Sequence, residues 1–253
     1  MSRHIMSRSI RVQKRHGLLS TVQPLEPRVL LTVSPEEQLF VYMLNRARHN
    51  PVAYQDENSL PVDLGYVPSR PPLAVNDHLF ASAEVHSNDM ATNNYAGHYS
   101  PFLNKWPNRM VRDAGYALPA TSIGSDGVTY VFADDGNSVE SLAAGMATTA
   151  SALSTLIVDA GVSGSGHRDH LLGISSFYSD SREIGVGHSF NSASSYQNYW
   201  VIHATRIAPT NQFLTGVVYN DANSNQRYDL NEGLAGVTIS AGMYSATTNS
   251  HGG

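Results

Sequence analysis

The spacing of apolar residues changes along this chain, and that change limits the possible folds more than any other feature. Between residues 34 and 172, apolar side chains recur mainly every three or four positions, which is typical of helices with one buried face. Between residues 183 and 206 they alternate with other residues, as in strands with two different faces. Helices followed by strands predict an α+β fold in which helices pack on an antiparallel sheet.

Local signals mark where several helices begin and end. Ser34 is a typical N-cap residue, Pro35 suits the first helical position, and Glu37 is placed to complete a capping box. The pattern ends at Asn50-Pro51. Further helices are expected after Asn76, over residues 105–114, from Asn137 or Ser138 to about Val158, and over residues 167–172.

The remaining segments predict loops and strands. Residues 61–72 and 124–136 are expected to be irregular, whereas 183–190 and 199–206 are expected to be antiparallel strands. After a linker at 209–212, two more strands are predicted over 213–219 and 237–241. Since so short a segment buries little core by itself, we expect residues 213–253 to begin an incomplete β-domain.

Composition excludes some functions. The chain has 253 residues, of which 41% are hydrophobic, but no run approaches the roughly 18 apolar residues of a membrane span. With a net charge of −5, the sequence beyond its N-terminus has no basic face suited to nucleic acid. Because cysteine is absent, any metal must be held by His, Asp, Glu or carbonyl groups.

Residues 1–33 differ from the rest. Their basic residues all precede the first carboxylate, Glu26, apart from Arg28, and a short apolar stretch follows Gly17. The segment Leu25–Thr32 resembles the Leu-Glu-Pro-Arg segment found near the N-terminus of many exported proteins of planctomycete-type bacteria. That resemblance implies export to the cell surface or the medium, and a disordered basic tail is the alternative.

Two histidines are the strongest candidates for function. His98 stands between a glycine and a Tyr-Ser-Pro turn, and His167 follows a Gly-Ser-Gly loop. Neither lies in an apolar stripe, so packing in a core explains them poorly. Acidic residues Glu140 and Asp159 lie between them in the sequence. If the four converge, they make either a divalent-metal site or a general acid/base site.

Several short motifs follow one another in a characteristic order. They are Leu44–Arg48 with Asn50-Pro51, Pro72–Asn76, Ala83–Ala91, Gly97–Pro101, Ser138–Ala144, Gly166–Arg168, Glu183–Gly187 and Tyr199-Trp200. In this order they resemble the CAP superfamily (cysteine-rich secretory proteins, antigen 5 and pathogenesis-related 1), whose domain is also called SCP, over about residues 34–208. The resemblance implies an α-β-α sandwich with an antiparallel sheet.

The same resemblance implies a site in a groove, formed by His98, Glu140, Asp159 and His167. The two histidines would coordinate a zinc-like divalent ion, and the two carboxylates would orient them. Asp159 is assigned by helical register within residues 156–159. Glu140 stands in Val-Glu-Ser, where the family has Gly-Glu-Asn.

Residues 221–232 form a second candidate metal motif. Oxygen-bearing side chains follow EF-hand spacing, although Gln226 stands where that loop needs glycine. The flanking residues resemble the start of an SdrD B-like (Cna-B-type) repeat of surface adhesins. This implies calcium that stiffens a stalk and is held by Asp221, Asn223, Asn225, Asp229 and Glu232. A polar hairpin loop without metal is the alternative.

The other histidines are expected to serve structure. We expect His86 to use Asp89 as an acceptor, His170 to be exposed, and His188 and His203 to pack on a face of the sheet. An internal salt bridge is expected for Arg168 rather than a ligand contact.

Three functions remain open. The first is an exported bacterial binding module whose groove accepts a metal and an extracellular ligand, such as a lipid, glycan or protein. The second is a metal-dependent hydrolase that uses the same residues, with Glu140 as general base. The third is a structural adhesin segment with a vestigial site. Because the family has no shared catalytic activity, we favour binding over catalysis.

Overall fold

The computed structural model describes residues 33–206 and 213–253. Its helices are α1 (Pro35–His49), α2 (Pro51–Glu57), α3 (Asp77–Asn93), α4 (Pro107–Asp113), α5 (Thr149–Val158), the 3₁₀ turn η1 (Ser163–Ser165), α6 (Gly166–Leu172) and α7 (Ser176–Ser179). Its strands are β1 (Ala74–Val75), β2 (Thr121–Ile123), β3 (Thr129–Val131), β4 (Glu140–Ala144), β5 (Glu183–Phe190), β6 (Asn198–Thr205), β7 (Thr238–Ala241) and β8 (Tyr244–Thr247). The predicted export segment lies outside these residues apart from Val33, as does the linker at 209–212.

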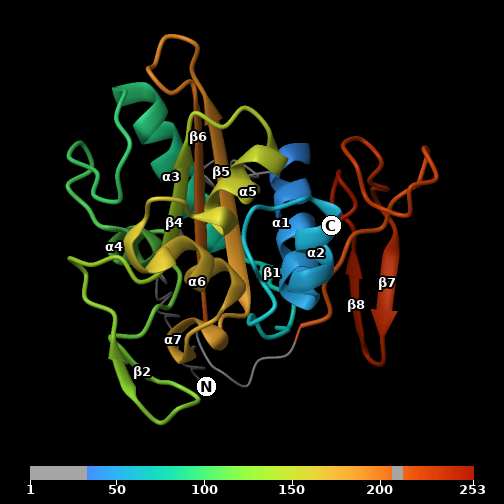
Figure 1. Cartoon of the computed structure of the whole chain (residues 1–253), viewed down its shortest axis with the longest axis horizontal. Helices are drawn as coiled ribbons and strands as arrows, with labels where there is room; N and C mark the ends of the chain where they lie inside the picture. Colours follow the sequence, from blue (N-terminus) through green and yellow to red (C-terminus); the bar gives the residue numbers. More distant parts are fainter. Residues whose placement is uncertain (1–32, 207–212) are drawn as a thin grey trace, which may run out of the picture. The chain divides into compact units, whose positions relative to one another are not determined.

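A four-stranded sheet forms the middle layer, in the order β1-β5-β6-β4. The strands β5 and β6 form the expected antiparallel pair, β4 is antiparallel to β6, and β1 is parallel to β5. Helix α3 covers one face, while α1, α5 and α6 cover the other (Figure 1). The fold is therefore α+β with α-β-α layers, as predicted.

Helix α3 lies unusually close to the sheet because β5 carries two glycines. A Cβ atom added at Gly185 would lie 2.1 Å from the backbone of Leu79, and one added at Gly187 would lie 2.4 Å from that of Ala83. Only glycine permits so close an approach of helix backbone to strand backbone. The opposite face of the sheet buries larger side chains, including Phe40 stacked on Trp200 with 5.8 Å between ring centroids.

The helix ends follow the local signals. Ser34 caps α1 in a complete capping box, since its backbone N–H donates to Glu37 Oε2 at 2.7 Å and its hydroxyl accepts from the Glu37 N–H at 3.3 Å. Asn76 caps α3 by accepting the N–H groups of His78 and Leu79. These predictions are confirmed, as is the short helix that begins next to His167.

The predicted helix from Asn137 or Ser138 to Val158 is wrong in its first half. Glu140–Ala144 is a strand, and α5 begins only after Thr148, whose side chain caps it. Gly145, at φ +86°, separates the two elements. The run from 139 to 144 is too short for its apolar spacing to distinguish helix from strand, and pairing with β6 decides in favour of the strand.

Two other predictions need correction. Thr121–Ile123 and Thr129–Val131 form a hairpin, so residues 124–136 are only partly a loop. No strand forms over 213–219, where only Tyr219 makes an isolated bridge to Gly233, although the predicted strand at 237–241 is present as β7. The limits proposed for the separate domains stay a prediction. Among the described residues, no helix is both long and apolar enough to cross a membrane.

Candidate functional site

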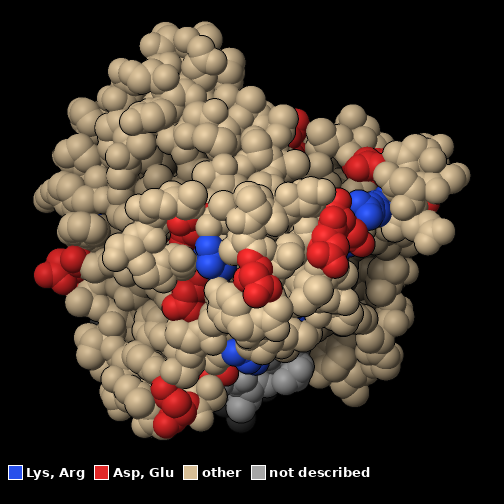
Figure 2. All heavy atoms as spheres, viewed as in Figure 1, with Lys and Arg blue, Asp and Glu red and all other residues tan. Residues whose placement is uncertain are grey.

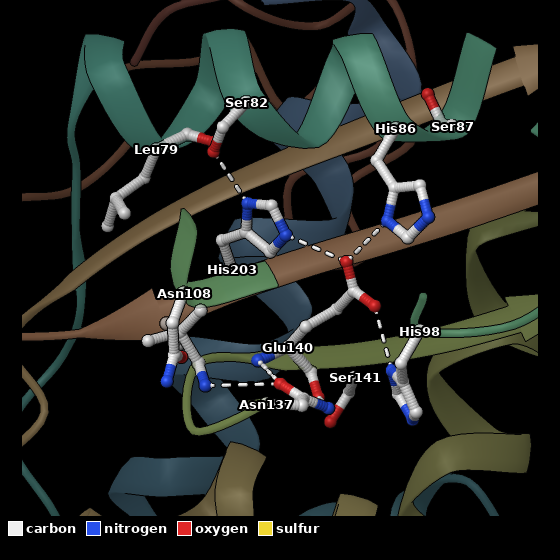
Figure 3. Close-up of polar contacts among 12 residues, drawn as sticks. Leu79, Ser82, His86, Ser87, His98, Asn108, Asn137, Glu140, Ser141 and His203 are labelled. Atoms are coloured by element: carbon white, nitrogen blue, oxygen red, sulfur yellow. Dashed lines mark hydrogen bonds and ion pairs between the residues drawn. The ribbon is translucent and has the colours of Figure 1, made fainter. Parts of the chain in front are cut away.

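Glu140 is the centre of a buried polar cluster between β4 and α3. Its Oε2 atom accepts hydrogen bonds from His86 Nδ1 at 2.6 Å and from His203 Nε2 at 2.8 Å. Its Oε1 atom accepts from His98 Nδ1 at 2.7 Å (Figure 3). The side chains of Glu140, His86 and His203 are fully buried, whereas 34% of the His98 side chain is exposed. Three imidazoles thus converge on one carboxylate.

The charges within this cluster follow from its contacts. Burial alone would raise the pKa of Glu140, but the positive charge of His86 and the hydrogen bonds from His203, His86 and His98 hold that pKa well below its usual value. Burial tends to lower the pKa of His86, yet Glu140 and Asp89 raise it on balance. Between the usual pKa values of a carboxyl group and an imidazole, Glu140 is therefore ionised and paired with a protonated His86.

His203 plays the neutral part in this cluster. Burial lowers its pKa despite the hydrogen bond to Glu140. Its Nδ1 atom lies 2.6 Å from the hydroxyl of Ser82, which donates to the Leu79 carbonyl at 3.0 Å, and its Nε2 atom lies 2.8 Å from Glu140 Oε2. Both nitrogens of His203 therefore have polar partners inside the cluster.

The loop that carries His98 is fixed by Asp89 at the end of α3. The Asp89 carboxylate accepts from the hydroxyl of Ser100 at 2.6 Å, from the Asn93 amide at 2.8 Å and from the hydroxyl of Tyr95. Asn93 and Tyr95 precede His98 in the sequence and Ser100 follows it, so the loop is held on both sides of His98. Asp89 therefore accepts hydrogen bonds from the loop and not from His86, the donor expected from the sequence.

Asp159 has the corresponding role for His167. It ends α5 in the left-handed conformation, at φ 53°. One oxygen accepts His167 Nδ1 at 2.8 Å, and the other accepts the backbone N–H groups of His167 at 2.9 Å and Arg168 at 3.2 Å. Arg168 does not form the expected salt bridge with any residue in the described part of the chain, and its guanidinium instead donates to the carbonyls of Ile157 and Val158.

The structure brings the four residues proposed from the sequence together as two imidazole–carboxylate pairs. The rings of His98 and His167 lie 6.3 Å apart between centroids, at an angle of 41°. In each ring Nδ1–H donates to a carboxylate, which leaves the lone pair on Nε2. Hydrogen bonding of the inner nitrogen to a carboxylate is the usual arrangement of metal-ligating histidines. The donor set therefore suits a divalent ion with open coordination positions.

A second group also has the spacing of metal ligands. One ligand atom each of His86, Glu140 and His203 lies within 4.8 Å of the other two. Here, however, both imidazoles donate to the same oxygen of Glu140, and all three side chains are closed off from solvent. The contacts with Glu140 occupy Nδ1 of His86 and Nε2 of His203, whereas the buried Nε2 atom of His86 has no hydrogen-bond partner among the described residues.

Sequence reasoning missed the roles of His86 and His203. His203 lies directly opposite Glu140 in the β4–β6 register, so a correct prediction of β4 would have brought the two together. For His86, on α3, no local signal indicates contact with a residue so distant in the sequence. A pairing between elements far apart in the chain decides its role.

His170 and His188 complete the comparison. The expectation that His170 is exposed was wrong, since it is buried and its two nitrogens contact the Ser141 hydroxyl at 2.8 Å and the Ala204 carbonyl at 2.9 Å. Burial lowers its pKa to about 4, so it is neutral. His188 stacks on Trp200 with ring centroids 3.9 Å apart, in line with the expected packing on a sheet face.

A cleft of about 450 Å³ runs between β4 and α5 and reaches His167. Its lining consists of Leu142, Ala143, Ala144, Ser154, Thr155, Leu156, Val158, Asp159, Ala160, Val162 and His167. The volume falls within the range of roughly 300–1,000 Å³ that is usual for ligand clefts. Charged side chains are scattered over the face seen in Figure 2, with no continuous basic patch.

The loop at residues 221–232 is closed by its own side chains. Asp229 Oδ2 accepts the amides of Asn223 at 2.7 Å and Asn225 at 2.6 Å, while Glu232 accepts the N–H groups of residues 222 and 229. Gln226 adopts φ 61° at the position where glycine was expected, and its N–H donates to Asp221. The five oxygen-bearing side chains thus gather around one turn. Calcium binding there stays a prediction.

Comparison with known proteins gave structural likenesses only. No protein-family model matches the chain, and no curated protein does either. One similar solved structure is an extracellular protein containing a SCP domain from Bacillus anthracis str. Ames, with 18% identity, a TM-score of 0.40, and coverage of 73% of this chain and 45% of that protein. The present chain thus spans less than half of it.

Two further solved structures are similar. An outer surface protein from Borrelia burgdorferi has 12% identity and a TM-score of 0.39, with 67% of this chain and 94% of that one covered. The CAP domain of enterococcal PrgA has 16% identity and a TM-score of 0.36, with 71% and 66% covered. At such TM-scores these likenesses carry no argument, and the fold rests on this chain's own sheet order and helix packing.

Proposed function

We propose that this chain is an exported binding module of the CAP type, which holds a divalent ion such as zinc through His98 and His167. The observation that carries the proposal is the pair of imidazoles whose inner nitrogens are both held by buried carboxylates. Their outer nitrogens are left as ligands, and His167 lines a cleft. Export rests on the sequence of residues 25–32 alone.

The protein residues divide this task. Glu140 and Asp159 fix the tautomer and the direction of the two rings, and protonated His86 keeps Glu140 ionised in its buried position. A bound ion would supply a Lewis acid that attracts an anionic or carbonyl oxygen of an extracellular ligand. Both histidines are partly exposed, at 34% and 21% of their side chains, so a ligand reaches them from solvent.

The environment of Glu140 favours binding over hydrolysis. A general base must reach a water molecule or a substrate proton. Both oxygens of Glu140 accept from imidazole N–H groups instead, and its side chain has no exposed surface. A hydrolase that uses Glu140 as its base would first have to break this cluster.

Zinc titration tests the proposed site. Isothermal calorimetry and thermal unfolding of the wild-type chain should show binding and a rise in Tm, and both should be lost in the His98→Ala/His167→Ala double variant. His49→Ala is the matched control, because His49 is exposed and its side chain makes no hydrogen bond among the described residues. Equal zinc binding by the double variant, or no zinc binding by the wild type, contradicts the proposal. The remaining hypothesis is then a structural segment with a vestigial site.

We further propose that residues 221–232 bind calcium and stiffen a stalk. Support comes from the spacing of five oxygen-bearing side chains and from their convergence on one turn. Calorimetric titration of the full chain with calcium should give a heat of binding that Asp229→Asn abolishes. Asp56→Asn, at an exposed position away from the loop, should leave it unchanged. Identical heats in both variants contradict calcium binding at this loop.

A further inference from the structure

The strand β4 has a free backbone edge. It ends the sheet order β1-β5-β6-β4, and among the described strands it pairs only with β6. The Gly145 N–H donates to the Asn198 carbonyl, and the Ala204 N–H donates to the Val139 carbonyl. In an antiparallel ladder such contacts alternate, so the odd-numbered residues of this strand face β6. The backbone groups of Glu140, Leu142 and Ala144 therefore point away from the sheet.

At Glu140 this free edge is already filled. The side-chain amide of Asn137 accepts from the Glu140 N–H at 2.9 Å and donates to the Glu140 carbonyl at 3.1 Å (Figure 3). One amide group thus supplies both an acceptor and a donor to a single strand residue, as a neighbouring strand does in a ladder. The edge at this point suits a peptide group.

Leu142 and Ala144 lack such a neighbour. Within residues 33–206 and 213–253, no group donates to or accepts from their outward N–H and carbonyl groups. Both residues are only half-buried, and both line the cleft between β4 and α5. Apart from Ser154, Thr155 and the Asp159–His167 pair, the cleft is lined by apolar side chains.

We propose that this cleft binds an extended peptide segment of another protein, which adds to the sheet as a strand opposite Leu142 and Ala144. Each of these residues offers one N–H donor and one carbonyl acceptor on the same edge. A peptide backbone is the group that can hydrogen-bond to both of them and repeat this every two residues. Because the lining is mainly apolar, the segment should carry uncharged, apolar side chains toward α5. This inference rests on the proposed binding function, because it names the class of ligand that the groove would accept.

Asn137 limits the length of the added strand. Its amide occupies the place beside Glu140, so regular pairing is confined to Leu142 and Ala144. On the other side, Gly145 adopts φ +86° and ends β4. The peptide must therefore bend or end near Glu140, the residue to which His98 donates. A bound ion at His98 and His167 would meet the peptide at that end.

A peptide selected for binding provides the probe. Random heptapeptides displayed on phage are selected against the full chain, and the enriched peptide is labelled for fluorescence anisotropy. Ala144→Pro removes the outward N–H but no hydrogen bond to β6, since proline is tolerated where an edge N–H faces away from the sheet. It should lower affinity by about tenfold or more, the loss of roughly one hydrogen bond together with a steric block. Ala246→Val, at an exposed position of β8 that does not line the cleft, should leave the affinity unchanged.

A second measurement does not depend on how the proline variant folds. The selected peptide is methylated at one backbone nitrogen at a time and tested on the wild-type chain. Pairing as a strand predicts that every second methyl group abolishes binding and the others are tolerated. No enrichment in the selection, or binding that ignores the methyl pattern, overturns the proposal. Light scattering that shows a dimer lost in Ala144→Pro also overturns it, in favour of a second copy as occupant.

The metal and the peptide can fail separately. The same anisotropy titration is repeated with a chelator and with the His98→Ala/His167→Ala variant. Backbone pairing needs no ion, so the alternating methyl pattern should persist in both. If zinc does not bind but the pattern is present, only the metal site is refuted. If zinc binds but no peptide is selected, only the peptide is refuted.

Discussion

Replacing Glu140 by glutamine tests the buried cluster most directly. The substitution keeps the size of the side chain but removes the charge that faces protonated His86 and accepts from His98 and His203. The new amide group also brings two N–H donors toward imidazole N–H donors. At least one buried donor is then left without an acceptor, and His86 loses its counter-charge.

The magnitude follows from these losses. Removing one partner of a buried ion pair typically costs about 3–5 kcal/mol. We therefore expect the free energy of unfolding of Glu140→Gln to be about 4 kcal/mol lower than that of the wild type. Glu57→Gln is the matched control, since Glu57 pairs with Arg46 and both side chains are 30% exposed. Its loss should be below about 1 kcal/mol.

The pH of the measurement matters, because the two shifts have opposite signs. The pKa of Glu140 is lowered, so its contribution is fully present above the usual value of 4.5 and is lost as pH falls through the lowered pKa. The pKa of His86 is raised, so its contribution is fully present below the usual value of 6.5 and is lost as pH rises through the raised pKa. Urea unfolding at about pH 5.5 therefore detects both.

Zinc affinity provides a second assay for the same variant. Loss of the carboxylate that orients a ligating histidine usually weakens metal binding by about 10–100-fold. Glu140→Gln should show this loss in a calorimetric zinc titration, and Glu57→Gln should not. Equal unfolding midpoints and equal zinc affinities in the two variants would refute the role assigned to the cluster.

Three further perturbations have defined outcomes. His170→Gln should make the fold less sensitive to acid, because burial lowers the pKa of His170 from 6.5 to about 4. Between pH 7 and pH 4 the free energy of unfolding of the wild type should fall by about 3 kcal/mol more than that of the variant. Parallel pH profiles would refute this. Gly187→Ala should lower the free energy of unfolding in urea by about 3 kcal/mol, since the new Cβ atom would lie 2.4 Å from the backbone of α3. Gly97→Ala is the control, because no atom of the described residues lies within contact distance of its Cβ position, and it should be nearly neutral. Equal losses in the two variants would contradict the close packing of α3 on β5. Asn137→Asp should cost about 1–2 kcal/mol, because it removes the donor to the Glu140 carbonyl, and an unchanged unfolding midpoint would show that this contact is unimportant.

Features that depend on neighbours in the sequence were predictable. The start of α1 follows from Ser34 and Glu37, which contact each other three residues apart. The antiparallel strands β5 and β6 follow from their alternation and the short turn between them. Of the two candidate histidines, His98 was expected beside a turn and His167 at the start of a short helix, both away from any apolar stripe. The structure places their rings next to each other.

Features that depend on distant neighbours were not predictable. The five residues of β4 fit a helix as well as a strand until β6 lies beside them. The role of His86 needs Glu140, which is 54 residues away, and that of His203 needs the β4–β6 register. In both cases tertiary contact, and not local propensity, decides the outcome.

The double role of Asp159 has a consequence for the strength of the proposed metal binding. The same carboxylate supplies the first hydrogen bonds of α6 and the acceptor for the His167 ring. The orientation of the His167 ring is therefore fixed once α6 has formed. An ion that binds there would not have to order that side chain. Binding then avoids the loss of about 0.5–1.5 kcal/mol that ordering a free side chain requires. A variant that loosens the start of α6 should weaken zinc binding even though no ligand atom has been removed.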